Sequence, residues 1–101
     1  MIIAPDITVP DTEVAALCRR YQVRELSIFG SAARGELRPD SDVDLLVDFE
    51  PEARIGLLEL GAMMDELSAL VGRRVDIAIK RALKPRIRSE VLADARILYA
   101  A

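Results

Sequence analysis

The sequence predicts an α/β fold, with a three-stranded and mostly mixed sheet flanked by helices. Segments with apolar residues at helical spacing alternate along the chain with short segments rich in β-branched residues, which is the pattern of sheets covered by helices. Half of the residues (51%) are hydrophobic, so the chain can form a packed core. Its 101 residues leave room for one domain, and we expect a single domain over residues 1–101.

The first half of the chain predicts a helix, a strand, a short helix and a second strand. The helix spans 10–21, with Pro10 at its first position and acidic residues in its first turn. Its inward positions recur at helical spacing: Val14, Leu17, Cys18 and Tyr21. The first strand spans 25–29, a short helix spans 31–35, and the second strand spans 42–49. The apolar centre of that second strand predicts burial on both faces.

The second half predicts a long helix, a third strand and a last helix. The long helix spans 57–71 and ends at Gly72. Its inward face has the spacing 3, 4, 3, 4, with the residues Leu57, Leu60, Met64, Leu67 and Val71. The third strand spans 73–79, and the last helix begins at Pro85. The inward positions of this last helix are Ile87, Val91, Ala95 and Leu98.

Composition excludes several classes of chemistry. The chain has no histidine and one cysteine, Cys18, so an internal disulfide, a histidine-containing zinc site and an imidazole base are impossible. The net charge of −3 and the scarcity of aromatic residues argue against direct nucleic-acid binding. No basic leader and no apolar run of about 20 residues is present, so we expect no membrane insertion and a cytoplasmic location.

Residues 30–44 combine a small, flexible turn with two closely spaced carboxylates. Gly30 permits close approach of the backbone to an anion, and Ser31 offers a hydroxyl and an N–H at a helix start. Asp42 and Asp44 lie on the same face of a strand, about 7 Å apart along the backbone. Crowded carboxylates repel each other unless a cation lies between them, and hard oxygen ligands suit Mg²⁺ or Mn²⁺. The pattern predicts a nucleoside-triphosphate site.

Other phosphate-binding motifs do not fit this stretch. The glycines at 30 and 35 match the spacing G-x-x-x-x-G, but Glu36 and Leu37 occupy positions where a P-loop requires Lys and Ser or Thr. No G-x-G-x-x-G follows a strand, which excludes a Rossmann site. The purely structural alternative is that Gly30 and Ser31 form a strand-to-helix turn and that the aspartates are polar residues at the start of a strand.

The motif resembles a known family. Gly-Ser, ten intervening residues and Asp-x-Asp are similar to the signature of DNA polymerase beta-like nucleotidyltransferases. The segments FGSAARGE and SDVDLLVDF resemble the minimal nucleotidyltransferase (MNT) branch, and the similarity runs from about residue 10 to residue 99. The resemblance implies the polymerase beta-like nucleotidyltransferase fold, ATP as substrate and two Mg²⁺ ions. It assigns Asp42, Asp44 and Asp76 as catalytic residues and metal ligands.

Asp76 is the lone acid among apolar residues of the third predicted strand. A carboxylate in such a strand costs free energy unless it is paired or bound to metal. The resemblance implies a third catalytic carboxylate here, acting as metal ligand, proton acceptor or both. The alternative is a salt bridge from Asp76 to Arg73 or Arg74.

Cationic residues near the motif and in the last helix also have two interpretations. Arg34 is a candidate for binding a nucleotide phosphate, or it forms a salt bridge to Glu36 or Asp40. Five cations gather before and within the first turn of the last helix: Lys80, Arg81, Lys84, Arg86 and Arg88. They face either an anionic partner, such as a triphosphate or an acidic protein surface, or only solvent.

The resemblance implies a function as an antitoxin. Such a protein transfers AMP from ATP to a hydroxyl, expected to be a tyrosine, of a partner HEPN-domain toxin and so silences it. The chain has no evident acceptor-binding domain, which places the acceptor on a separate macromolecule. One rival is a non-catalytic antitoxin that neutralises its partner by binding. Another is a small-molecule nucleotidyltransferase, which the short chain disfavours. A binding module has no need of clustered acids, so the three aspartates favour the enzyme.

Overall fold

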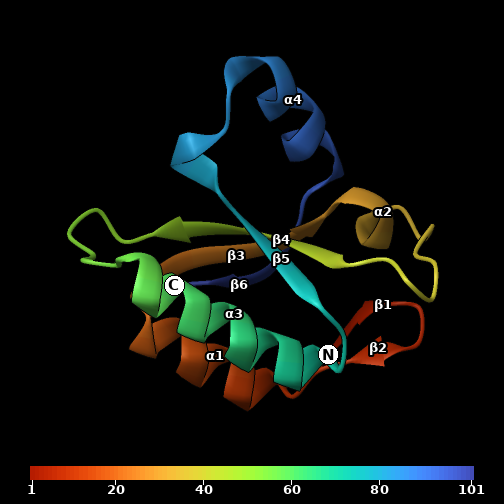
Figure 1. Ribbon diagram of the computed structural model, residues 1–101, viewed down its shortest axis with the longest axis horizontal. Coiled ribbons are helices and arrows are strands. Elements are labelled where there is room, and N and C mark those ends of the chain that lie inside the picture. Colours follow the sequence, from red (N-terminus) through yellow and green to blue (C-terminus); the bar gives the residue numbers. More distant parts are fainter.

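The computed structural model describes residues 1–101 and contains six strands, four α-helices and one 3₁₀ helix, η1 (Figure 1). The strands are β1 (Ile2–Ala4), β2 (Ile7–Thr8), β3 (Val23–Phe29), β4 (Val43–Phe49), β5 (Val75–Ile79) and β6 (Arg96–Ala100). The helices are α1 (Asp11–Arg20), α2 (Gly30–Ala33), α3 (Leu57–Val71), η1 (Lys80–Ala82) and α4 (Pro85–Asp94). No helix combines the length and apolar character that crossing a membrane requires.

The main sheet has four strands in the order β5-β4-β3-β6, so the prediction of three strands was one short. Strand β4 pairs in parallel with β5 and antiparallel with β3, which confirms a mixed sheet. Strand β6 pairs antiparallel with the other edge of β3. The two central strands therefore carry the most apolar side chains, as expected for strands with neighbours on both sides.

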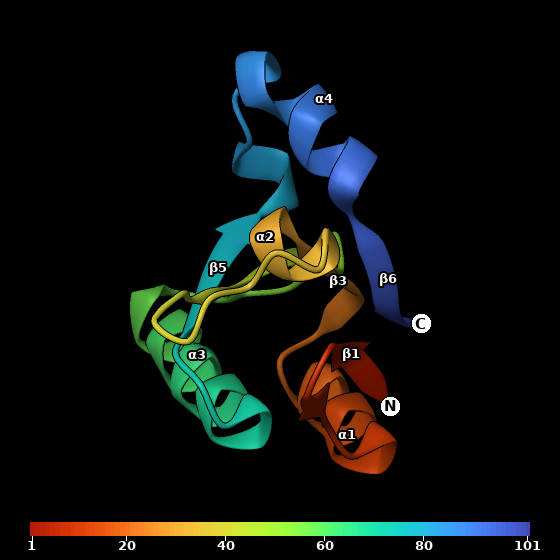
Figure 2. The same ribbon diagram turned by 90° about the vertical axis from the view of Figure 1, so that its right-hand side faces the viewer.

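Helices cover both faces of this sheet. Figures 1 and 2 show α1 and α3 side by side on one face, with α2 and α4 on the other. The core between the sheet and the α1–α3 layer includes Val43, Leu45 and Val47 of β4, which alternate along the strand. Leu46, on the opposite face of β4, is also buried, which confirms the prediction that the second strand is covered on both faces.

A short hairpin at the N-terminus was not anticipated from the sequence. Strands β1 and β2 pair antiparallel around a turn in which Asp6 has a φ of +66°, a left-handed conformation that aspartate tolerates better than most residues. Ile3 and Ile7 from this hairpin belong to the core. The guanidinium of Arg96 in β6 donates to the Ile3 carbonyl over 2.8 Å, which links the hairpin to the main sheet.

The boundaries of α1 and α3 correct details of the sequence analysis. Pro10 precedes α1 as its N-cap residue and is not its first helical residue. Gly72 ends α3 in the left-handed conformation with a φ of +77°, as predicted. The inward face of α3 is rotated from the prediction, because Met63 is fully buried while Leu57 is 88% exposed. Leu57, in the first turn of α3, does not pack against the hydrophobic core.

The predicted last helix is shorter than expected. It ends at Asp94, and Ala95 adopts an extended conformation with φ −64° and ψ 133°. The segment that follows forms β6, so Leu98 lies in a strand and not on an inward helical face. Strand β3 would otherwise present an unpaired edge of backbone N–H and C=O groups, and β6 provides the partner.

The burial of Met63 predicts a specific effect on stability. Met63→Ala should lower the free energy of unfolding by about 2–5 kcal/mol, because it removes fully buried methylene and thioether groups and leaves a cavity. Met64→Ala, at a half-buried neighbour, is the matched control and should cost clearly less. Urea denaturation of the two variants would measure the difference, and equal losses would contradict the assigned face of α3.

Candidate active site

Pairing between β4 and β5 brings two of the three predicted carboxylates together. Asp44 and Asp76 are direct neighbours in the parallel register. Asp42 immediately precedes β4, two residues before Asp44. Asp42 and Asp44 are half-buried and Asp76 is exposed. The three residues therefore lie along one end of adjacent strands, with increasing exposure toward the β5 edge.

The Gly-Ser turn lies against the same carboxylates. Phe29, the last residue of β3, pairs with Asp44 across the sheet, and Gly30 follows with a φ of +70°. A Cβ atom at Gly30 would lie 2.5 Å from Oδ2 of Asp44, closer than any real contact. Glycine is thus required twice here, for its left-handed backbone and for the close approach of Asp44. Ser31 comes next, half-buried in the single turn of α2.

Burial raises the pKa of Asp44 above its usual range, and repulsion from Asp76 and Asp42 raises it further. The positive charge of Arg34 acts in the opposite direction. The three carboxylates do not converge on one point as a ready metal cage. Their chemistry nevertheless fits Mg²⁺, because the donors are all hard oxygen atoms and their mutual repulsion would be relieved by a dication.

Arg34 joins α2 to α4. Its Nε donates to Glu36 over 2.7 Å, and its Nη1 donates to Asp94 at the end of α4 over 2.5 Å. These hydrogen bonds raise the pKa of the Arg34 guanidinium, so it remains a fixed positive charge. Of the two predicted salt-bridge partners, Glu36 is paired with Arg34 and Asp40 is not. Asp94 was missed, because it lies 60 residues away in the sequence.

Arg73 holds the loop that leads into Asp42. Its guanidinium donates to the Ser41 carbonyl over 2.9 Å and also to the Arg38 carbonyl. The backbone N–H of Val43 donates to the Arg74 carbonyl over 2.9 Å. Neither arginine forms an ion pair with Asp76, contrary to the alternative considered from the sequence. Arg73 is therefore a positioning residue that sequence patterns alone did not identify.

Asp48 shares a face of β4 with Asp44 but serves a structural purpose. Its side chain is buried (the residue is 5% exposed) and accepts a hydrogen bond from Arg24 over 2.6 Å. Nε of Arg81 lies 3.5 Å from its other oxygen. Two guanidinium groups thus compensate its charge, as a buried carboxylate requires.

Three of the five cations near α4 are engaged within the chain. Lys80 pairs with Glu25 at 3.4 Å, Arg81 pairs with Asp48, and Arg88 donates to the Lys80 carbonyl. The side chains of Lys84 and Arg86 form no ion pair or hydrogen bond with the rest of the chain. These two cations remain free for an external partner or solvent.

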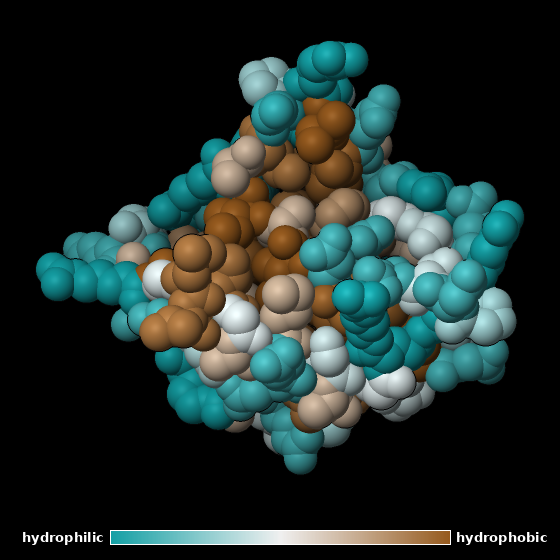
Figure 3. Space-filling model, in the orientation of Figure 1, coloured by the Kyte–Doolittle hydropathy of each residue, from teal (hydrophilic) through white to brown (hydrophobic).

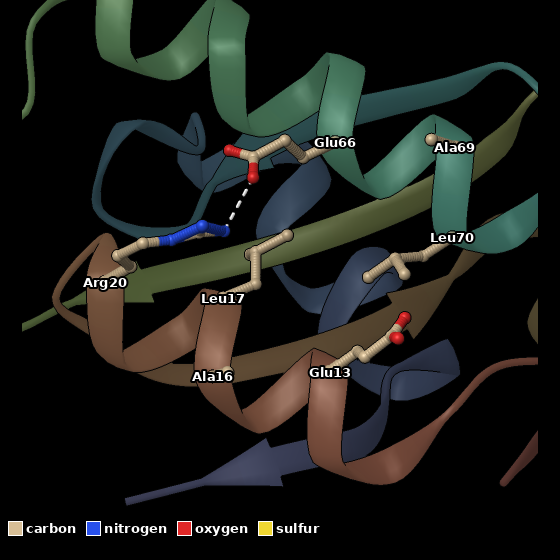
Figure 4. Close-up of a pocket in the computed structure, with 7 residues that line it drawn as sticks. All are labelled: Glu13, Ala16, Leu17, Arg20, Glu66, Ala69 and Leu70. Atoms are coloured by element: carbon tan, nitrogen blue, oxygen red, sulfur yellow. Dashed lines mark hydrogen bonds and ion pairs between the residues drawn. The ribbon is translucent and has the colours of Figure 1, made fainter.

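The largest surface hollow lies away from the carboxylates. It is a groove of about 470 Å³ between α1 and α3, on the opposite face of the sheet (Figure 4). Leu17 and Leu70 form part of its apolar floor, and the Arg20–Glu66 ion pair at 2.6 Å crosses one end. The groove contains none of the predicted site residues, so we assign the candidate site to the carboxylates and the Gly-Ser turn.

Comparisons with known proteins show the family to which the chain belongs. A family model described as a nucleotidyltransferase domain matches residues 14–98. The protein adenylyltransferase MntA of Thermococcus cleftensis is 46% identical over 78 residues, 77% of each chain. A solved structure assigned as a minimal nucleotidyltransferase superposes with a TM-score of 0.72 at 44% identity, covering 85% of this chain and 86% of that one. The Shewanella oneidensis MNT antitoxin, solved in complex with a tri-AMPylated HEPN toxin, shares the fold with a TM-score of 0.64 at 15% identity, covering 90% and 70%.

The raised pKa of Asp44 predicts that Asp44→Asn increases thermal stability in a pH-dependent way. At neutral pH the ionised carboxylate destabilises the folded state relative to the unfolded state, so the amide should raise the melting temperature. Below the ordinary aspartate pKa of about 3.9 the carboxyl is protonated in both states, so the gain should disappear. Thermal melts across this pH range measure the effect. Asp40→Asn, in the exposed loop, should show no such gain.

The contacts of Arg73 predict a local loss of order. Arg73→Ala should speed amide hydrogen exchange at residues 38–42, because two carbonyls of this loop lose their shared donor. Arg74→Ala is the matched control, since Arg74 holds Val43 through its backbone only. Unchanged exchange in Arg73→Ala would show that the loop is held by other contacts.

Proposed function

Because the chain belongs to the nucleotidyltransferase domain family, we propose that it transfers AMP from ATP to a hydroxyl group of a separate protein. The observation that carries this proposal is the juxtaposition of Asp44, Asp76 and Gly30. A structural turn has no need to place a carboxylate against a glycine and beside a second carboxylate. The relative at 46% identity is named a protein adenylyltransferase, which supports a protein as the acceptor.

In the proposed reaction, the acceptor oxygen bonds to the α-phosphorus of ATP, and the bond from that phosphorus to the bridging oxygen breaks. Pyrophosphate leaves, and the acceptor proton passes to Asp76. Mg²⁺, when bound, supplies charge that neutralises the triphosphate and lowers the pKa of the incoming hydroxyl. Asp42 and Asp44 would hold one ion, and a second would share them with Asp76. A tyrosine acceptor needs such assistance, since its pKa is about 10.

The donor side of the site would lie at α2. The absence of a side chain at Gly30 would let a phosphate approach the backbone closely, and Ser31 would provide a hydroxyl and an N–H. Arg34 is our candidate for an additional phosphate contact. Arg34 is paired with Glu36 and with Asp94 at the end of α4, so its guanidinium lies between α2 and α4, next to this turn.

We propose a HEPN-domain toxin as the acceptor, silenced by AMP on a tyrosine, with this chain as its antitoxin. The Shewanella oneidensis protein that shares the fold was solved with a tri-AMPylated HEPN toxin, which supports this choice. The second candidate function is neutralisation of the toxin by binding alone. The Asp44–Asp76 pair favours the enzyme, because pure binding would not explain the retained repulsion between them.

Mass spectrometry of the acceptor tests the proposal directly. A purified HEPN-domain toxin, the proposed acceptor, should gain the mass of AMP after incubation with the chain, ATP and Mg²⁺. Asp42→Asn and Asp44→Asn should abolish the gain, because a neutral amide is a poor ligand for a hard dication. Asp40→Asn, two positions before Asp42 and outside the ten-residue spacing from Ser31, should keep most of the activity.

A toxicity rescue assay separates the two candidate functions. If transfer is the mechanism, Asp44→Asn should bind the HEPN-domain protein but fail to rescue growth. An unmodified partner with the wild-type chain, together with full rescue by Asp44→Asn, would overturn the enzymatic proposal in favour of neutralisation by binding.

A further inference from the structure

An apolar band crosses the face of the molecule that looks onto the β5 edge of the sheet. Figure 3 shows hydrophobic atoms gathered from the start of α3, across the end of β5, to α4. Leu57 and Leu58 of α3 are 88% and 89% exposed, and Ile87 of α4 is also exposed. Ile79 ends β5, Leu83 follows η1, and both are partly exposed. We call these five residues the β5-edge band.

We propose that the β5-edge band is the docking surface for the acceptor protein. The inference rests on the proposed function and adds where the partner binds. Leu57 and Leu58 are exposed at adjacent positions in the first turn of α3. Neither contacts the core, so neither side chain stabilises the fold by burial. A contiguous exposed apolar patch on a small protein marks a site of interaction.

The arrangement of the carboxylates places the acceptor on this side. Gly30 and Ser31 follow β3, whereas Asp76 lies on β5, on the other side of β4. Asp76 is the exposed member of the three aspartates. The Arg34–Asp94 ion pair ties α2 to α4 near the β3 side. Asp76 lies near the start of β5 and the band near its end, so a protein bound to the band would extend along this open edge strand to reach the carboxylates.

Charge on the band indicates the chemistry of the partner. Lys84 and Arg86 precede Ile87 in the chain, and their side chains have no partner within it, whereas Lys80 and Arg81 are neutralised by Glu25 and Asp48. The matching surface should carry apolar side chains bordered by aspartate or glutamate residues. Such a rim would speed association, while the leucines would supply most of the affinity.

Binding and transfer by the double variant Leu57→Ser/Leu58→Ser test the proposal. Isothermal titration with the HEPN-domain protein, without nucleotide, should show affinity weakened about tenfold or more. In the transfer assay, KM for the acceptor should rise while the thermal shift produced by Mg-ATP stays unchanged. The matched control is Ile2→Ser/Ile97→Ser, which removes two residues that are 74% and 62% exposed outside the band. This control should bind like the wild-type chain.

Arg86→Glu provides a second variant that leaves the apolar residues intact. It should slow association with the HEPN-domain protein and weaken the salt dependence of the rate, since one steering charge is reversed. An association rate equal to that of the wild-type chain would overturn the assignment of acidic groups to the partner.

Other outcomes distinguish this proposal from the proposed function. If the wild-type chain binds without transferring AMP and the leucine variant loses binding, the docking surface stands and the enzymatic proposal fails. Equal binding by the leucine variant and the wild-type chain would overturn the docking surface, as would no binding by either.

Sedimentation of the chain alone is the last check. A dimer that the leucine variant abolishes would assign the band to a second copy and overturn the proposal.

Discussion

The lateral pairing of Asp44 with Asp76 is the electrostatic constraint on which the rest of the structure depends. Parallel strands lie about 4.8 Å apart, so neighbouring carboxylates at matched positions repel each other strongly when they are ionised. The same strand, β4, offsets this cost by burying Val43, Leu45 and Val47 against α1 and α3. One strand thus carries an apolar face that stabilises the fold and a polar end that destabilises it locally. Such local conflict is characteristic of a functional site.

Rigid support surrounds these carboxylates on both sides. Gly30 lies directly against Asp44, and Arg73 fixes the loop that precedes Asp42. Each contact orders a connecting segment whose conformational entropy would otherwise oppose a defined site. Preorganised groups avoid that cost at the moment of reaction. The loop and the turn are therefore as important to the geometry as the aspartates.

The two sides of the main sheet differ in how their strand edges are covered. Strand β6 covers β3 with an antiparallel partner, and the Arg96 side chain binds it to the N-terminal hairpin. Strand β5 leaves its outer edge open, with the exposed Asp76 near its start and the apolar start of α3 near its end (Figure 1). In the proposed function, a nucleotide at α2 and a protein substrate at the β5 edge would approach one set of carboxylates from different directions.

Local sequence alone determined that apolar and polar residues alternate in the strand over 42–49, that α3 ends at Gly72, and that the backbone at Gly30 can approach other groups closely. Each of these features follows from the chemistry of adjacent positions. It also grouped Asp42 with Asp44. Only the tertiary structure decided that residues 96–100 form β6, because their pattern also fits a helix and the deciding partner, β3, is remote in sequence. The same holds for Arg34, whose partner Asp94 is 60 residues away, and for Arg73, which binds backbone carbonyls that carry no sequence signal.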